Sequence, residues 1–454
     1  MKIIIIGIGS IGKSILKNLS GEGHTITIID EDKDLIEELI EKYDVFCVVG
    51  NGACMDIQQE ADAKNADLVI ALTRNDELNI FACLVAKRLG VHHTVARVRN
   101  PDYRRQIGQM QDSLGISMVV NPERETATEI FNLINLPSVA SMEHFARGKV
   151  LLVEVIAKEG CAMVGESLIS LGHKLSSKVL VCAVQRGDEI IIPSGSFVIQ
   201  SGDRVHVTAD AKTLGAFLEE VNLVTSPLKK VMIIGGGKIG YYLADELSKK
   251  KYSVKLIEEN PAKAADLAVE LPKVTVACGN GTKHDLLIEE GIEAMDAFVA
   301  LTDVDEENII VSMFANRKNV RKAITQIEND ELLGMLDELG IDNVISPQQV
   351  VASQIISYAR ALSNSIGSNV QTLYQLVDNQ VEALEFIAKK QERLYGRPLK
   401  DLSIKNDCLV ACIIRDNRVI IPDGNSRIEL GDSVVVVTTR KNLDDLADVF
   451  DTKN

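Results

Sequence analysis

Residues 2–12 read KIIIIGIGSIG, and residues 230–240 read KVMIIGGGKIG. Each stretch begins with an apolar run suited to a buried β-strand and continues into a G-x-G-x-x-G turn that opens a helical pattern. A glycine turn between a buried strand and a helix is typical of Rossmann domains. These two stretches therefore predict a chain with two Rossmann domains.

The similarity between the two stretches extends over the whole chain. Matching segments recur at a shift of 228 or 229 residues, which indicates a tandem duplication joined near Ser226-Pro227. The matching pairs are Asp30 and Glu258, Gly50-Asn51-Gly52 and Gly279-Asn280-Gly281, Ala71-Leu72-Thr73 and Ala300-Leu301-Thr302, Asn79 and Asn308, Ile192-Pro193-Ser194-Gly195 and Ile421-Pro422-Asp423-Gly424, and Gly202-Asp203 and Gly431-Asp432.

Each repeat divides into a larger and a smaller part. In the first repeat, apolar runs alternate with helical patterns, and residues 2–6, 25–30, 45–49, 67–72, 94–98 and 117–120 are predicted strands of a parallel sheet. The smaller part has predicted strands at 149–156, 179–185, 189–192 and 204–208 and a helix at 211–221. The predicted class is α/β: two Rossmann-like, doubly wound parallel-sheet domains (1–137 and 228–366) alternate with two small α+β lobes (138–225 and 367–454).

The glycine turns are the candidate phosphate sites. In the first turn, Gly7 would make the tight bend, Gly9 would let a pyrophosphate approach the backbone, and Gly12 would let helix and strand pack closely. The helix that follows offers unpaired N–H groups to phosphates. The predicted binding residues at the two turns are Gly7, Ile8, Gly9, Ser10, Ile11 and Gly12, and Gly235, Gly236, Gly237, Lys238, Ile239 and Gly240. The alternative is that nucleotide binding was lost and that the glycines are kept only for packing.

An acidic residue ends the second predicted strand of each repeat. Asp30 and Glu258 each follow the first glycine of their turn by 23 residues. A carboxylate in this place accepts hydrogen bonds from the adenosine ribose hydroxyls and repels a 2′-phosphate. Both repeats are therefore predicted to prefer NAD(H) over NADP(H).

Polar residues that follow the third and fourth strands are further candidates. Asn51 and Asn280 are interpreted either as adenine or ribose contacts or as turn residues. Thr73-Arg74 and Thr302-Asp303 are interpreted either as phosphate or ribose contacts or as helix caps, with each threonine capping the helix that follows.

Arg97 lies in the fifth predicted strand, within VARVRN (95–100), and an arginine in an apolar strand needs an anion. That anion is either the phosphate of a ligand or the carboxylate of a neighbouring residue. The second repeat has Gln326 in the same place, within ITQIEN (324–329), so the second site is expected to be weaker or to prefer a less anionic ligand.

No catalytic or metal-binding set is predicted. The seven histidines are scattered, the eight cysteines form no CxxC pair, and Cys408 and Cys412 are expected to be buried thiols on one face of a strand. The net charge of −16 argues against a nucleic-acid partner and against binding to anionic lipid. No apolar run reaches the ~18–20 residues that cross a bilayer, and a cytosolic protein without membrane insertion is expected.

The motifs together resemble the RCK (also called KTN) regulatory subunits of bacterial Trk potassium-uptake systems. The resemblance rests on the segments IIIIGIGSIG (3–12), VVGNG (48–52), ALT (71–73), GESL (165–168), IIIPSG (190–195) and SGD (201–203), and on the repetition of the whole unit. It covers nearly all of the 454 residues.

The resemblance implies a peripheral protein on the inner face of the cell membrane that binds NAD(H), with ATP or ADP as alternatives. The implied partner is a TrkH-like integral membrane potassium-translocating subunit, and the implied assembly is a homo-oligomer, expected to be a tetrameric ring. The two Rossmann domains of one chain can pair through a pseudo-twofold axis. An NAD-dependent oxidoreductase and a free-standing redox or nucleotide sensor are the alternative functions.

Overall fold

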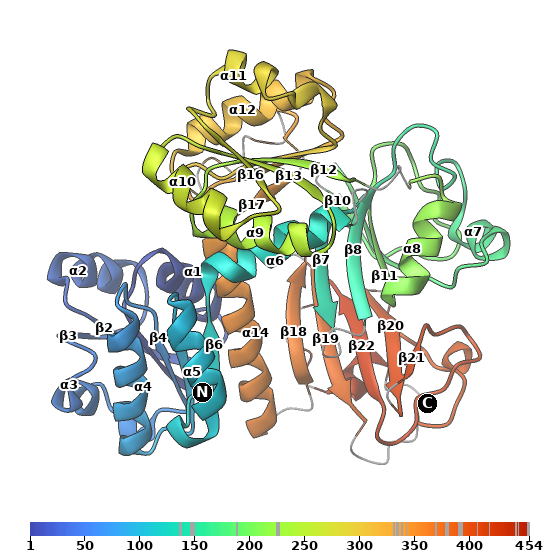
Figure 1. Cartoon of the computed structure of the whole chain (residues 1–454). Coiled ribbons are helices and arrows are strands. Elements are labelled where there is room, and N and C mark those ends of the chain that lie inside the picture. Colours follow the sequence, from blue (N-terminus) through green and yellow to red (C-terminus); the bar gives the residue numbers. More distant parts are fainter. Residues whose placement is uncertain are drawn as a thin grey trace. The chain divides into compact units, whose positions relative to one another are not determined.

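The computed structural model describes residues 1–451 except for 136–138, 146–149, 188, 224–227, 330–331, 333–335, 337–338, 342, 368–369, 377–380, 389–393, 406, 417, 441–442 and 444. The predicted junction at Ser226-Pro227 and the predicted strand start at residue 149 lie outside this set. Two compact units are formed, each from both halves of the chain. Residues 1–134 and 228–356 make the Rossmann unit, and residues 135–227 and 357–454 make the antiparallel unit (Figure 1).

The Rossmann unit contains two six-stranded sheets whose described pairings are all parallel. Their strand orders, β3-β2-β1-β4-β5-β6 and β14-β13-β12-β15-β16-β17, are the same order in the two halves. The first half has strands β1 (Lys2–Ile6), β2 (Thr25–Asp30), β3 (Phe46–Val49), β4 (Leu68–Ala71), β5 (His93–Arg97) and β6 (Met118–Val120) and helices α1 (Ser10–Leu19), α2 (Lys33–Lys42), α3 (Met55–Glu60), α4 (Asp76–Leu89), α5 (Pro101–Leu114) and α6 (Pro122–Asn135).

The second half repeats this order of elements. Its strands are β12 (Lys230–Ile234), β13 (Ser253–Glu258), β14 (Thr275–Cys278), β15 (Ala297–Ala300), β16 (Lys322–Gln326) and β17 (Val344–Ile345), and its helices are α9 (Lys238–Lys249), α10 (Pro261–Glu270), α11 (His284–Glu289), α12 (Asp305–Arg317) and α14 (Pro347–Gly367). The order 3-2-1-4-5-6 places the carboxyl ends of the first and fourth strands side by side, which is where ligands bind in such sheets.

Local sequence explains these elements. Four consecutive isoleucines make β1 buried on both faces, as a central parallel strand must be. Helix α1 buries Ile11, Ile15, Leu16 and Leu19 against the sheet, and their spacing is that of one helix face. The first Rossmann domain therefore begins with a strand–turn–helix unit that the sequence specifies locally.

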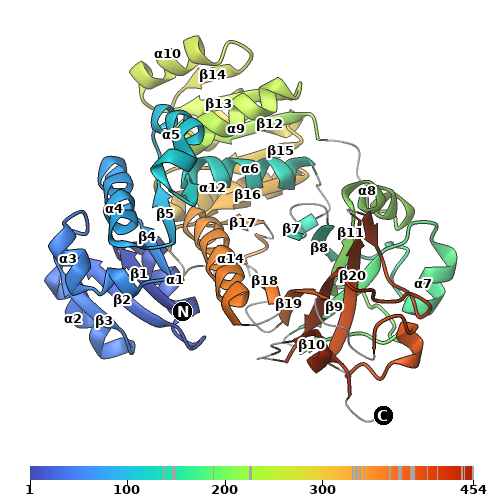
Figure 2. The ribbon, with the colours of Figure 1, turned by 90° about the horizontal axis from the view of Figure 1, so that it is seen from below.

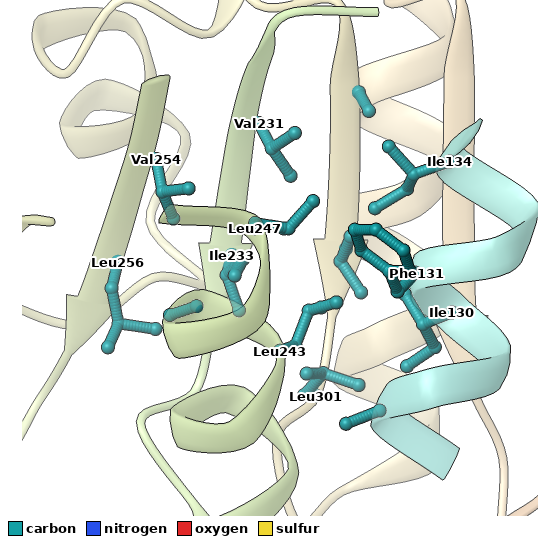
Figure 3. Close-up of a cluster of buried hydrophobic side chains, with 14 of the residues drawn as sticks. Ile130, Phe131, Ile134, Val231, Ile233, Leu243, Leu247, Val254, Leu256 and Leu301 are labelled. Atoms are coloured by element: carbon teal, nitrogen blue, oxygen red, sulfur yellow. The ribbon is translucent and has the colours of Figure 1, made fainter. Parts of the chain in front are cut away.

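Helix α6 of the first half packs against the sheet of the second half. Ile130, Phe131 and Ile134 lie in one buried cluster with residues of β12 and α9, among them Leu243 and Leu247. Figure 3 shows these side chains pointing toward one another across the two halves. Each large apolar side chain buried in this way contributes about 1.5–3 kcal/mol, so the cluster is a substantial link between the halves.

Helix α14 makes the reciprocal connection. Its first part runs beside α1 of the first half in both views (Figures 1 and 2). Val351, Ala352 and Ile355 on this part are buried. Gln354 Nε2 also donates to Glu125 Oε2 of α6 at 3.3 Å. The Rossmann unit is therefore a pair of domains that exchange helices.

The antiparallel unit contains two five-stranded sheets with the orders β10-β9-β11-β8-β7 and β18-β19-β22-β20-β21. Residues of both sheets form a common apolar cluster, which includes Leu152, Cys182, Cys412 and Val437. The elements are β7 (Val139–Phe145), β8 (Val150–Ile156), α7 (Leu168–Lys174), β9 (Leu180–Arg186), β10 (Glu189–Ile191), β11 (Arg204–Ala209), α8 (Ala211–Glu220), β18 (Val370–Leu376), β19 (Val381–Ile387), β20 (Cys408–Arg415), β21 (Arg418–Ile420) and β22 (Ser433–Thr438).

The predicted fold class is confirmed, with two corrections in the antiparallel unit. Strand β7 and helix α7 were not predicted. Cys408 and Cys412 are both buried, but they lie on opposite faces of β20, in two different clusters. The reason is a β-bulge between Val410 and Cys412, which inserts one residue and reverses the alternation of side chains.

None of the helices in the described part of the chain is both long and apolar enough to cross a membrane.

Candidate functional site

A cavity of about 830 Å³ opens at the carboxyl ends of the first half's strands. Both halves of the chain line it. The residues of the first half are Ile6, Gly7, Gly9, Ser10, Ile11, Gly12, Ile29, Asp30, Glu31, Asp32, Leu35, Gly50, Gly52, Leu72, Thr73, Arg74, Asn75, Leu78, Arg97, Arg99, Pro122 and Glu123, and those of the second half are Ile239, Glu328, Pro347 and Gln348.

The first glycine turn has the geometry that each of its glycines requires. Gly7 has a φ of +87°, and a Cβ added there would lie 2.9 Å from the Thr73 nitrogen. A Cβ on Gly12 would lie 2.7 Å from the Gly7 oxygen, so only glycine lets α1 approach the turn.

Gly9 differs from both of these positions. It has a φ of −65°, and nothing lies within 4 Å of a Cβ added there. A side chain at Gly9 would therefore occupy the cavity, and it would not clash with the rest of the protein. The N-terminus of α1 begins at Ser10, directly after Gly9, and opens to that space.

Asp30 is half-buried at the end of β2 and lines the same cavity. Its Oδ2 accepts the Ile8 N–H at 2.8 Å and its Oδ1 accepts the Asp32 N–H at 3.0 Å. An ionised carboxylate offers about four lone-pair sites. Asp30 can therefore hold the turn and still accept hydrogen bonds from a hydroxyl-bearing ligand.

A fully buried asparagine fixes the loop after β4. Asn79 Oδ1 accepts the Thr73 N–H and the Thr73 hydroxyl, both at 2.8 Å. Asn79 Nδ2 donates to the carbonyls of Thr73 at 3.0 Å and Arg97 at 2.9 Å, which ties the loop to β5. Thr73 is therefore not the cap of α4. That role belongs to Asn75, whose Oδ1 accepts the Leu78 N–H at 2.7 Å.

Arg97 brings a positive charge to the cavity wall, and its Nε finds no partner among the described residues. This Nε is buried, and no carboxylate of the described residues lies within the 4.0 Å of an ion pair. Burial lowers the pKa of Arg97, and the charge of Arg99 adds to that effect. An arginine nevertheless remains protonated at neutral pH. The ion-pair interpretation of Arg97 is therefore wrong for the described residues, and the need for an anion remains.

Other polar groups around Arg97 are also incompletely paired. Arg99 lies 3.9 Å from both Asp76 and Glu123, and it donates to the Arg74 carbonyl at 2.9 Å. The Arg99 Nε, one oxygen of Asp76 and one oxygen of Glu123 are buried and have no hydrogen-bond partner within the described part of the chain. Unpaired buried polar atoms are rare in proteins, so their concentration at this wall indicates a ligand site.

The second half repeats the frame of this site. Gly235 has a φ of +101°, and a Cβ there would lie 2.3 Å from the Leu301 oxygen. Asn308 bonds Thr302 and the Gln326 carbonyl as Asn79 bonds Thr73 and the Arg97 carbonyl, so Thr302 is not a cap either. Val304 stands at the cap position of α12 and has no side-chain cap bond.

In the second half, Glu258 and Asn280 already make hydrogen bonds within the protein. Glu258 is only 6 % exposed and accepts from Gly236 N at 3.0 Å, from Asn260 N at 2.9 Å and from Lys263 Nζ at 3.0 Å. Asn280 Oδ1 accepts the Thr282 N–H at 2.8 Å, which is a turn interaction, and Lys238 is exposed at the start of α9.

The cavity brings together half of the predicted residues. Gly7, Gly9, Ser10, Ile11, Gly12, Asp30, Thr73, Arg74, Arg97 and Ile239 line it. Ile8 is buried behind it, and Asn51 makes an Asx turn by accepting the Ala53 N–H at 2.8 Å. The other predicted residues, which lie away from this cavity, are Gly235, Gly236, Gly237, Lys238, Gly240, Glu258, Asn280 and Thr302.

Four residues of the two sites were not predicted from the sequence: Arg99, Glu123, Glu328 and Lys263. Arg99 follows the carboxyl end of β5 (His93–Arg97), and ligands bind at the carboxyl ends of such strands, so this basic side chain could have been predicted.

Strand order 3-2-1-4-5-6, a glycine turn at the first crossover and an acid at the end of the second strand define the first unit as a pair of Rossmann domains. The family models of the TrkA-N domain (residues 3–122 and 231–347) and the TrkA-C domain (residues 152–222 and 384–451) match the chain twice each. The chain belongs to the TrkA family of Trk system potassium uptake proteins.

Full-length relatives share this arrangement. The chain is 33% identical to the Trk system potassium uptake protein TrkA of Vibrio alginolyticus, over 99% of this chain and 98% of that protein. It is 31% identical to the TrkA homolog 1 of Methanosarcina mazei, over 96% and 97% of the two chains.

Solved structures show the same fold. The structure named GsuK channel bound to NAD has a TM-score of 0.62 at 17% identity and covers 97% of this chain and 77% of that one. The GsuK structure bound to ADP has a TM-score of 0.50 at 16% identity, over 80% and 69% of the two chains.

Proposed function

We propose that this chain is a nucleotide-binding regulatory subunit of a Trk-type potassium-uptake system, and that its first half binds NAD(H). The observation that supports this most strongly is the convergence of three groups on one cavity: the N-terminus of α1, the Asp30 carboxylate and the unpaired Arg97 guanidinium. A helix N-terminus and an arginine suit the pyrophosphate, and the carboxylate suits a ribose.

The names of related proteins supply the physiological setting of the proposal. The full-length relatives are potassium uptake proteins, and structures of the same fold are named as bound to NAD and to ADP. We place the chain on the cytoplasmic side of the cell membrane, as a peripheral homo-oligomeric ring bound to an integral potassium-translocating subunit. ATP and ADP compete for the same cavity in this proposal.

The composition of the cavity wall supports binding without turnover. The residues that line it in the described part of the chain include no histidine, cysteine, lysine or tyrosine. These four side chains, with the carboxylates, are the usual general acids and bases for proton transfer. NADH is expected to bind and to be recovered unchanged, and steady oxidation in proportion to enzyme would show the oxidoreductase alternative instead.

Two matched variants test the proposal in the full chain. Gly9 and Gly237 both have ordinary φ values (−65° and −57°), and a Cβ on either meets nothing within 4 Å. Gly9→Leu and Gly237→Leu should therefore fold while filling the phosphate space of one half each.

NADH titration by fluorescence should show that Gly9→Leu removes the tight site and Gly237→Leu removes a weaker one. In cells, Gly9→Leu should uncouple potassium uptake from the nucleotide. A Gly9→Leu protein that still binds NADH as tightly as the wild type would refute the proposed site.

A further inference from the structure

The two halves hold their strand-end acids in different ways. Asp30 is half-buried, lines the cavity and has two backbone partners, the N–H groups of Ile8 and Asp32. Glu258 has the equivalent two, the N–H groups of Gly236 and Asn260, but it is 6 % exposed. A third partner, the Lys263 ammonium, lies 3.0 Å from its Oε2.

A paired sequence difference explains why Glu258 is withdrawn. A Cβ on Gly236 would lie 2.7 Å from the Glu258 Oε2, so the longer acid fits because this position is glycine. The first half has the buried Ile8 in the same place, together with the shorter Asp30. The glutamate and the glycine are therefore matched to each other, as are the aspartate and the isoleucine.

The cation is also specific to the second half. Lys263 stands on the first turn of α10, where α2 of the first half has Leu35. Leu35 lines the first-half cavity beside Asp30 and carries no charge. The side chain of Lys263 is 47% exposed, so its ammonium reaches Glu258 from the solvent side.

The ion pair is charged at neutral pH. Burial alone raises the pKa of Glu258, but the N–H of Asn260, the Lys263 ammonium and the N–H of Gly236 outweigh burial and lower it below 4.5. A carboxylate with three partners has little left for ribose hydroxyls. The adjacent ammonium also cancels the charge that would repel a 2′-phosphate.

We propose that Lys263 is the specificity-determining residue of the second half: by holding Glu258 in an internal ion pair, it lets that site accept adenine nucleotides with or without a 2′-phosphate. The first half, with Asp30 and Leu35, selects the unphosphorylated ribose. This inference rests on the proposed function, and it replaces the expectation that both halves prefer NAD(H) over NADP(H).

The test titrates each site separately in the full chain. In the Gly9→Leu background only the second site remains, and its affinities for NADH and NADPH should agree within about threefold. Adding Lys263→Leu, the residue of the first half, should create a preference for NADH of about tenfold or more. Lys263→Arg is the control, and its second site should still bind NADH and NADPH with similar affinity.

The reciprocal variant keeps the test decisive if Lys263→Leu does not fold. Leu35→Lys, in the Gly237→Leu background, should reduce the preference of the first site for NADH by about tenfold. A second site that already prefers NADH, or that binds neither nucleotide, would overturn the inference while the first site still binds. Loss of binding at the first site of the Gly237→Leu protein would instead refute the proposed function.

Discussion

Replacing Arg97 by glutamine should weaken nucleotide binding and strengthen the fold at the same time. Glutamine is a residue that this architecture accepts here, because Gln326 occupies the equivalent place at 5% exposure. The variant removes one cation from the cavity wall and leaves the backbone bond from Asn79 Nδ2 to the carbonyl of residue 97 in place.

The size of each effect follows from the partners of Arg97. A charge-assisted hydrogen bond to a phosphate contributes about 1.5–3 kcal/mol, which is about ten- to hundredfold in affinity. The Nε of Arg97 is buried and has no hydrogen-bond partner among the described residues. Removing such an atom relieves a desolvation cost, so the free energy of unfolding should rise by about 1 kcal/mol.

The assay combines calorimetric titration with NADH and thermal unfolding of the unliganded protein. Arg105→Gln is the control, because it changes the charge equally at a side chain that is 72% exposed and paired with Asp102. It should alter neither quantity. An Arg97→Gln protein with unchanged affinity and a lower unfolding temperature would show that Arg97 is a structural residue and would refute the reasoning.

Three further predictions concern the stability of the fold. Phe131→Ala should lower the free energy of unfolding, measured by urea denaturation, by about 3–5 kcal/mol, because Phe131 is 9% exposed within the cluster that joins the halves. Phe81→Ala is the control: Phe81 is 56% exposed, and the change should be less than about 0.5 kcal/mol. Gly7→Ala should cost about 1–3 kcal/mol because of its φ of +87°, and Gly9→Ala should cost nothing, so equal thermal midpoints would contradict the described turn. Glu258→Gln should destabilise the protein by about 1.5 kcal/mol at neutral pH. Because folding lowers the pKa of Glu258, this difference should shrink as the pH falls below 4.5 and vanish below the folded pKa, and a difference that persists in acid would argue against the ion pair.

The sequence predicted what depends on local spacing. The glycine turns, the buried strands and the acids at residues 30 and 258 follow from patterns of a few residues, and the repeat at a shift of 228 or 229 extends them to the second half. Patterns of this kind specify an element and its register without further information. The part of the cavity wall formed by Gly7, Gly9 and Asp30 could therefore be predicted from the sequence.

What remained hidden depends on contacts between distant segments. The apolar face of α6 indicates that Ile130 and Phe131 are buried, but not that they pack on the other half's sheet. The bulge in β20 leaves no mark in the sequence, so Cys408 and Cys412 were expected on one face. Thr73 resembles a cap by its position, and only the buried Asn79 shows why its hydroxyl points elsewhere.

The exchange of helices gives the gene duplication a physical meaning. A single repeat, expressed alone, would leave the apolar face formed by Ile130, Phe131 and Ile134 without its partner sheet, and a second copy could supply that sheet. Two identical copies would then carry identical pockets. Joining the copies in one chain ties each pocket permanently to a neighbour with a different sequence, so Arg97 and Gln326, or Leu35 and Lys263, can diverge while the shared interface keeps its shape. The covalent link thus turns a symmetric pair into one molecule whose two halves can carry different side chains at equivalent positions.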